Sequence, residues 1–137
     1  MGVTAASWLI DKSALVRIAR SQSAETWLDR INRGLVHISV ATLLEVGYSA
    51  MSPADWSVKV EEPPIALMPL AGITPAVERR AVEVQGILAG RGHHRAPSVP
   101  DLLIAAIGEV HGLVVLHQDE DFDLIAEITG QPLARID

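Results

Sequence analysis

The most informative segment of this chain is residues 7–13, SWLIDKS, in which a short apolar run ends in an acidic residue. Residues 7–10 are typical of a buried strand, and Asp11 or Ser13 is a suitable N-cap for a helix that runs to about residue 20. A strand that passes directly into a helix, if the order recurs along the chain, implies a mostly parallel sheet with helices on both faces.

The same alternation continues through the rest of the sequence. Further strands are predicted at 36–40, 65–70, 113–116 and 133–136. Helices are predicted at about 24–33, from 42 to the Ser-Pro break at 52–53, from 53 to 62, and at 75–90, 100–111 and 122–128. We therefore predict an α/β fold, a three-layer sandwich with a mostly parallel central sheet, in a single domain over residues 1–137.

The composition limits the classes of protein to which the chain can belong. Apolar residues make up 49% of it and charged residues 20%, which favours a packed core over disorder. The absence of cysteine excludes disulfides and thiol chemistry and fits a reducing, cytoplasmic setting. Neither a signal peptide nor a membrane span is predicted. The net charge of −6 does not support a nucleic-acid partner, although acids gathered in one metal site would account for most of it.

The predicted topology brings four carboxylates to one edge of the sheet. Asp11 ends the first strand, Asp119 follows the strand at 113–116, and Glu45 lies in the first turn of the helix after the second strand. Asp101 opens the helix at 100–111, which reaches the same edge if it packs on the central strands. Ligand sites in such sheets form beyond the carboxyl ends of the strands.

Each of these acids also has a purely structural explanation. Asp11 can cap its helix, and Asp119 can close an Asx turn. Glu45 and Asp101 each stand three residues after a hydroxyl residue, which is the spacing of a capping box. Four carboxylates together, however, repel one another unless a multivalent cation neutralises them. Oxygen ligands without histidine or cysteine favour Mg²⁺ or Mn²⁺.

Four segments carry the acids in order: residues 9–15 (LIDKSAL), 39–45 (SVATLLE), 100–106 (PDLLIAA) and 117–122 (HQDEDF). Together they resemble the motifs of PIN-domain nucleases, and specifically those of VapC-type toxins from bacterial toxin–antitoxin pairs. The resemblance covers essentially the whole chain. It implies a PIN-like sandwich and a metal-dependent endoribonuclease, the toxin of its pair, with Mg²⁺ or Mn²⁺ as cofactor.

The resemblance also implies roles for individual residues. Asp11 and Asp101 match the principal metal ligands. The acids that would complete the site, directly or through water, are Glu45, Asp119 and, as an additional ligand, Asp121. Ser13 matches a small hydroxyl residue that orients a carboxylate or a phosphate. At such a site a metal activates water to attack the phosphodiester, and a carboxylate such as Glu45 or Asp119 accepts the water's proton.

Basic residues close to these acids are candidates for RNA contact. Lys12 departs from the family pattern, in which threonine is common at this position. Its side chain either contacts a backbone phosphate or is solvated. The loop that leads into Asp101 carries Arg91, His93, His94 and Arg95. We expect a flexible polar loop, and the second interpretation is that Arg91 and Arg95 contact RNA phosphates. A histidine metal site is the least favoured interpretation, because neighbours in a loop seldom bind the same ion.

The resemblance further implies protein partners. One is an antitoxin that inserts a segment into the active-site cleft, where an arginine pairs with the carboxylates. The other is a second copy of the chain, because the helices around 43–60 present more apolar side chains than a helical pair can hide. These side chains are Val46, Tyr48, Met51, Trp56 and Val58.

Three other classes of protein fit the sequence less well. A haloacid-type, Mg²⁺-dependent phosphatase has a second aspartate two residues after its nucleophile, where this chain has Ser13. A response-regulator receiver needs a lysine late in the chain, whereas Lys59 is the last lysine here. A catalytically silent interaction domain with a PIN fold stays open, although all four acids are present.

Overall fold

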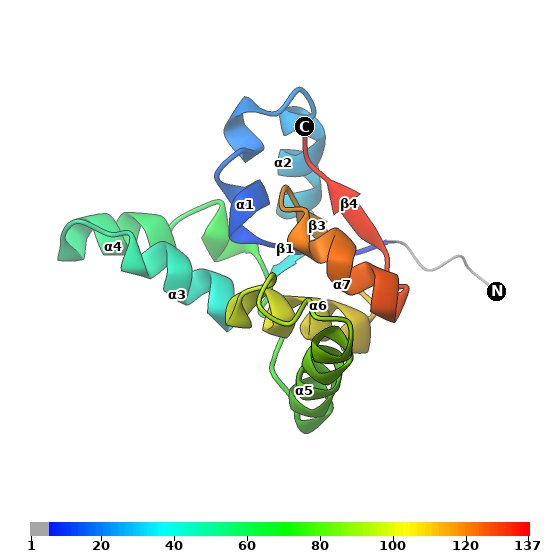
Figure 1. The fold of residues 1–137 in the computed structure, drawn as a ribbon. Helices are drawn as coiled ribbons and strands as arrows, with labels where there is room; N and C mark the ends of the chain where they lie inside the picture. Colours follow the sequence, from blue (N-terminus) through cyan, green and yellow to red (C-terminus); the bar gives the residue numbers. More distant parts are fainter. Residues whose placement is uncertain (1–5) are drawn as a thin grey trace.

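The computed structural model describes residues 6–137, and its centre is a sheet of four parallel strands in the order β2-β1-β3-β4 (Figure 1). The strands are β1 (Trp8–Ile10), β2 (Val36–Ile38), β3 (Val114–His117) and β4 (Leu133–Arg135). In the register of the sheet, Ile10 lies beside Ile38 on one side and Leu116 on the other. The carboxyl ends of β1, β2 and β3 therefore meet at one edge.

Helices connect the strands and cover the sheet. They are α1 (Lys12–Leu15), α2 (Ala24–Asn32), α3 (Val40–Tyr48), α4 (Pro53–Glu61), α5 (Pro75–Gly90), α6 (Val99–His111) and α7 (Asp121–Thr129), with 3-10 turns at Ile18–Arg20 and Ile65–Leu67. The helix ends follow the sequence signals. Thr74 caps α5 with Pro75 in its first turn, and Gly112 ends α6 in the left-handed conformation.

The sheet is buried on both faces, as the α/β sandwich prediction requires. On one face, Leu9 and Val115 pack in a core with α5, α6 and α7. On the other, Ile10 and Leu116 pack with α1, α2 and α3. Neighbouring residues along a strand point to opposite faces of the sheet. Leu9 and Ile10 therefore lie in different cores, and so do Val115 and Leu116. Figure 1 shows the two helical layers and the α3–α4 pair, which extends to one side as an arm.

The structure corrects several predicted boundaries. The predicted strand at 65–70 is instead a 3-10 turn, and only Leu70 bridges to Ile38. The predicted helix from Asp11 or Ser13 to about residue 20 divides into α1 and the 3-10 turn at Ile18–Arg20. The strand predicted at 36–40 ends at Ile38, because the Ser39 side chain caps α3. Within the described residues, no helix combines the length and apolar character needed to span a membrane.

Candidate active site

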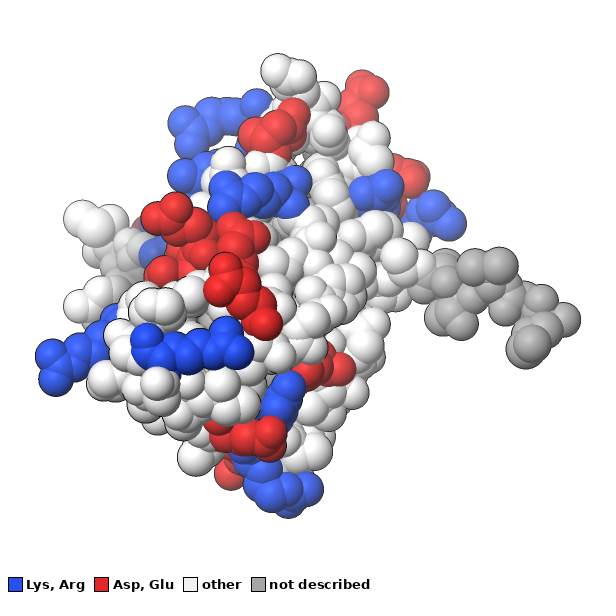
Figure 2. Space-filling view, turned by 45° about the vertical axis from the view of Figure 1, so that its right-hand side comes forward, with Lys and Arg blue, Asp and Glu red and all other residues white. Residues whose placement is uncertain are grey.

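A cleft of about 520 Å³ lies beyond the carboxyl ends of β1 and β3, and acidic side chains line it. All five acids proposed from sequence line this cleft: Asp11, Glu45, Asp101, Asp119 and Asp121. Figure 2 shows acidic side chains gathered in one patch with basic side chains beside it. The topology has thus brought together carboxylates that are up to 110 positions apart in the sequence.

Asp11 is held rigidly at the end of β1. Its backbone N–H donates to the carbonyl of Leu116 (3.0 Å), which continues the pairing of β1 with β3. Its Oδ2 accepts from the backbone N–H and the hydroxyl of Ser13, at 3.1 and 2.6 Å. The residue is therefore both a helix cap and part of the cleft, so the structural and functional interpretations are compatible.

Ser13 connects two parts of the site. Besides donating to Asp11, its Oγ accepts from the backbone N–H of Gln118 at 2.9 Å. Gln118 belongs to the loop between β3 and α7, which carries Asp119. Ser13 thus fastens the Asp11 carboxylate to the neighbouring acidic loop.

Asp101 lies in the first turn of α6, where it forms a capping box with Ser98. The Ser98 hydroxyl accepts from the Asp101 N–H at 3.2 Å, and the Asp101 carboxylate accepts from the Ser98 N–H at 3.3 Å. Burial raises the pKa of Asp101 to about 6, and the charges of Asp11 and Asp119 add to the rise while the Ser98 N–H opposes it. This carboxylate is therefore costly to ionise without a cation.

Asp119 and Asp121 lie together after β3. The Asp121 N–H donates to Asp119 Oδ1 at 2.9 Å, which closes the Asx turn expected from the sequence. Oxygen atoms of Asp101, Asp119 and Asp121 all lie within 4.8 Å of one another. Burial and the neighbouring charges of Asp119 and Glu120 raise the pKa of Asp121.

Glu45 reaches the cleft from α3. Its pKa is raised by partial burial and then by the charge of Asp11, while Lys12 lowers it. Asp11 and Glu45 are not part of the closest trio of carboxylates, although both line the same cleft.

The donor set of the cleft fits a hard divalent cation. Its acidic lining offers carboxylate oxygens, and neither histidine nor cysteine is among the lining residues. Three carboxylates within a few ångströms, one of them with its pKa raised to about 6, repel one another strongly in the metal-free protein. A cation bound by these oxygens would remove that repulsion.

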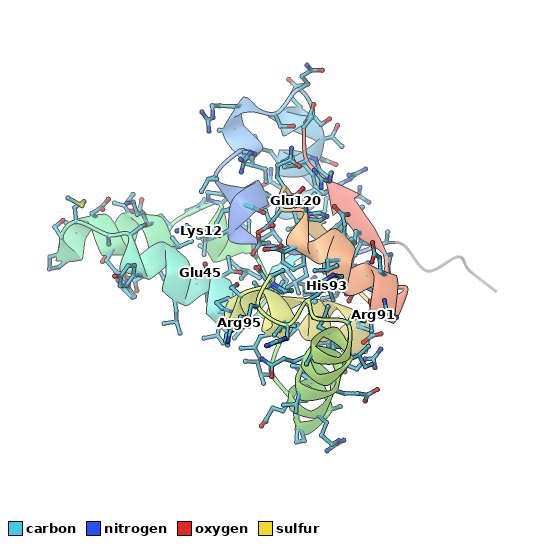
Figure 3. All side chains as sticks on the ribbon, in the orientation of Figure 1. Lys12, Glu45, Arg91, His93, Arg95 and Glu120 are labelled. Carbon is cyan, nitrogen blue, oxygen red and sulfur yellow. The ribbon has the colours of Figure 1, made fainter. Side chains whose placement is uncertain are left out.

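Two basic residues line the cleft, Lys12 from α1 and Arg95 from the loop before α6. Arg91, the other loop arginine proposed from sequence, is not among the lining residues. Figure 3 shows Arg95 and Arg91 on opposite sides of this loop. His93 and His94 are exposed, and the one candidate metal cluster among the described residues contains only aspartates.

His117 is a feature of the site to which the sequence alone assigned no role. It ends β3, is completely buried, and its Nδ1 accepts from the backbone N–H of Asp119 at 3.1 Å. Burial lowers the pKa of His117, which favours the neutral ring that this hydrogen bond requires. A histidine at the end of an apolar strand and two residues before an acid is the signal that could have identified it.

The raised pKa of Asp101 leads to a pH prediction for the metal-free protein. In the folded chain this group holds its proton up to about pH 6, whereas in the unfolded chain it releases it near 3.8. The folded state therefore binds more protons between these values, and the contribution of Asp101 to stability falls as the pH rises from about 4 to 6. The free energy of unfolding, measured by urea titration at several pH values, should show this slope in wild type and lose it in Asp101→Asn. If the free energy of unfolding depends on pH in the same way in both proteins, the prediction is contradicted.

Comparisons with known proteins agree with this geometry. A family model described as the PIN domain matches residues 8–128. Ribonuclease VapC2 of Mycobacterium tuberculosis (strain CDC 1551 / Oshkosh) is 57% identical over 129 residues, which cover 94% of this chain and 92% of that protein. The fold is similar to DNA-bound VapBC from Salmonella typhimurium (TM-score 0.78, 18% identity, 96% of this chain and 98% of that one). It is also similar to VapBC-5 from M. tuberculosis, a member of the VapBC family of toxin–antitoxin systems (TM-score 0.70, 24% identity, 96% and 99%).

Proposed function

This chain belongs to the PIN-domain family, and we propose that it is a metal-dependent endoribonuclease and the toxin of a toxin–antitoxin pair, with residues 1–137 acting as one domain. The observation that carries the proposal is the convergence of five carboxylates in one cleft, in a chain 57% identical to a VapC ribonuclease. The sequence resemblance to this family is confirmed by the family match over residues 8–128.

We assign the metal to the oxygen atoms of the cleft. Asp11 and Asp101 are proposed as principal ligands, with Asp119, Asp121 and Glu45 completing the site directly or through water. The support is the spacing of the Asp101, Asp119 and Asp121 oxygens and the influence of the Asp11 charge on Asp101 and Glu45. Oxygen donors of this kind favour Mg²⁺ or Mn²⁺.

The residues of the cleft have separate tasks in hydrolysis of an RNA phosphodiester. When bound, the divalent cation supplies an acidified water and neutralises charge on the phosphoryl oxygens. Glu45, whose pKa is raised by burial, is suited to accept the proton of the attacking water. Ser13 keeps the Asp11 carboxylate oriented through its hydrogen bond. Lys12 and Arg95 in the cleft lining contribute positive charge that would attract the RNA phosphates.

Incubation of purified protein with total RNA tests the proposal. We expect cleavage with Mg²⁺ or Mn²⁺, none with a chelator, and none by Asp11→Asn purified in the same way. Equal cutting by wild type and variant would mean a contaminating nuclease. An inactive wild type that binds no Mn²⁺ would leave a silent interaction domain as the better description.

The two loop arginines give a matched pair of variants for RNA contact. Arg95→Ala is expected to weaken RNA binding and to make the slope of log K against log salt shallower by about 0.7, the loss of one phosphate contact with single-stranded RNA. Arg91→Ala removes the same charge outside the cleft lining and should leave the slope unchanged. Binding of a labelled RNA at several salt concentrations measures both. Equal effects of the two variants would contradict an assignment to Arg95.

We propose an antitoxin as the protein partner, on the analogy of the VapBC toxin–antitoxin complexes with the same fold. A segment of that partner would enter the acidic cleft, where an arginine side chain suits the Asp101, Asp119 and Asp121 carboxylates. Five carboxylates line the cleft against two basic side chains, Lys12 and Arg95, so its negative charge is only partly compensated.

We also propose a homodimer, formed through the apolar side of α3 beside the cleft. A groove of about 540 Å³ there is lined mainly by apolar side chains, and Leu44 and Tyr48 are 68% and 93% exposed. The set expected from sequence needs one change: Val46 faces the core, whereas Met51, Trp56 and Val58 are exposed as predicted. Light scattering should give twice 14.7 kDa for wild type and a monomer for Tyr48→Arg. A monomeric wild type at micromolar concentrations would remove the proposal.

A further inference from the structure

We propose that His117 is a positioning residue for the Asp119 carboxylate, which it holds in the cleft through a hydrogen bond to the Asp119 backbone. The inference rests on the proposed function, since it concerns how the metal-binding acids are held. His117 does not line the cleft and is not proposed as a ligand. Its effect on the reaction would pass entirely through the loop that follows β3.

The contact defines the chemical state of the ring. The backbone N–H of Asp119 lies 3.1 Å from His117 Nδ1, and a backbone N–H can only donate. Nδ1 must therefore be the unprotonated nitrogen. In the neutral ring the proton is then on Nε2, and this is the only tautomer compatible with the observed contact.

The ring itself is fixed by the fold around it. His117 is 0% exposed, and its carbonyl accepts from the backbone N–H of Ile136 at 3.0 Å next to β4. On the helix side, the Phe122 ring packs against the imidazole with centroids 5.1 Å apart. The acceptor atom consequently has a fixed position relative to the sheet, and the N–H that it binds is fixed with it.

A second hydrogen bond holds the same loop. The Ser13 hydroxyl accepts from the N–H of Gln118 at 2.9 Å, so two consecutive backbone N–H groups are bound by side chains of β3 and α1. Asp119 Oδ1 in turn accepts from the Asp121 N–H. With its backbone tied at both places, the loop keeps the Asp119 and Asp121 carboxylates facing Asp101 despite their mutual repulsion.

The other ring nitrogen indicates that stability alone does not explain this residue. Nε2 is buried and has no hydrogen-bond partner among the described residues. A buried polar atom without a partner destabilises the folded state, and an apolar side chain of similar size would avoid the cost. The unpartnered Nε2 costs folding free energy, while Nδ1 binds the loop that carries the acids. This combination is typical of a residue retained for function and not for stability.

Three substitutions separate the acceptor from the packing. His117→Leu keeps the bulk and removes the acceptor. His117→Asn keeps an acceptor at the δ position, whereas His117→Gln carries the same amide one bond further from the backbone. We would measure the binding of Mn²⁺ alone by calorimetry, the thermal midpoint in chelator, and RNA cleavage.

The expected pattern is specific. His117→Leu and His117→Gln should weaken Mn²⁺ binding by about 10-fold or more, the usual effect of losing a residue that orients a ligand. His117→Asn should stay within about threefold of wild type, because it restores the acceptor. The leucine variant should melt no lower than wild type in chelator, which a purely structural role would not allow. Unchanged affinity in all variants, or equal weakening in asparagine and leucine, would overturn the inference.

A measurement without metal separates this inference from the proposed function. In protein labelled with ¹⁵N at histidine, the His117 resonances should report an unprotonated Nδ1 and a protonated Nε2 at neutral pH. The reverse tautomer would overturn the positioning role even if the protein cuts RNA. An inactive wild type that binds no Mn²⁺, with the expected tautomer present, would instead reject the proposed function and leave the contact intact.

Discussion

Replacing Asp101 with asparagine is expected to lower the rate of RNA cleavage by more than about 100-fold while making the metal-free protein more stable. The loss of activity follows from removing one of the converging carboxylates, since even residues that only orient ligands contribute 10- to 100-fold. The gain in stability follows from removing a buried charge. The pKa of this carboxyl is raised from 3.8 to about 6, which corresponds to roughly 1–3 kcal/mol at neutral pH.

Asparagine is the appropriate replacement because its side-chain oxygen still accepts from the Ser98 N–H and keeps the capping box. A matched control exists in α4, where Asp55 accepts from the Met51 N–H and donates its backbone N–H to Ser52 Oγ. Its pKa is lowered by that Met51 hydrogen bond and then by the Lys59 side chain. Asp55→Asn should leave cleavage unchanged and should not stabilise the protein.

Cleavage rates and urea unfolding in chelator, measured on both variants, test the two halves of this expectation separately. An Asp101→Asn protein that is inactive but less stable would mean that the carboxylate supports the fold. In that case its repulsion by Asp11 and Asp119 would be weaker than the geometry indicates. An active variant would remove Asp101 from the site altogether.

The second large effect is expected at Gly108, where α6 packs closely against Val115 of β3. A Cβ at this position would lie 2.7 Å from Val115 Cγ2 and 3.3 Å from the Leu113 carbonyl oxygen. Valine has little freedom to move in a core, so Gly108→Ala should force the helix away from the sheet. We expect a loss of about 1–3 kcal/mol of stability, as for other overpacked cores.

Gly86 provides the control, because it is also helical but a Cβ added there would have no neighbouring atom within 4 Å. Gly86→Ala should stabilise the protein by about 0.5–1 kcal/mol through helix propensity. Opposite signs in urea titrations of the two variants would establish close packing as the cause. If both substitutions stabilise the protein, the space between α6 and Val115 is large enough for an extra methyl group, and the prediction is wrong.

The edge of the sheet was predictable from the sequence because buried parallel strands are short apolar runs. Residues 7–10 and 113–116 carry this signal clearly, and both precede acids that line the cleft. Since the carboxyl ends of parallel strands meet, the strand pattern is sufficient to place Asp11 and Asp119 together. Taken singly, however, each of these acids could also be explained as a helix cap or a turn residue.

The segment at 65–70 shows why an apolar run alone is not sufficient. Ile65 and Met68 are buried while Ala66 and Leu67 are exposed, a spacing of three that suits a 3-10 turn rather than a strand. Only Leu70 reaches the sheet, beside Ile38. Such a run packs against the core without joining the ladder, and apolar content does not distinguish the two outcomes.

Side-chain geometry was the other part that the sequence could not supply. Spacing alone did not determine whether Asp121 reaches the site beside Asp119, whereas the Asx turn brings both toward Asp101. His117 was hidden for a similar reason, because its role depends on the direction of one ring nitrogen. Contacts of this kind arise from loop conformation, which residue patterns only weakly constrain.

The strand order has a consequence for how the protein is made. β1 pairs with β3, so the segment around Asp11 cannot take its place in the sheet until Val114–His117 have left the ribosome. Asp119 and Asp121 complete the acid cluster, and they follow β3 along the chain and emerge after it. For a ribonuclease, this order means that a nascent chain cannot assemble its acid cluster, and stays harmless to the message and the ribosome producing it, until these residues are free of the ribosome.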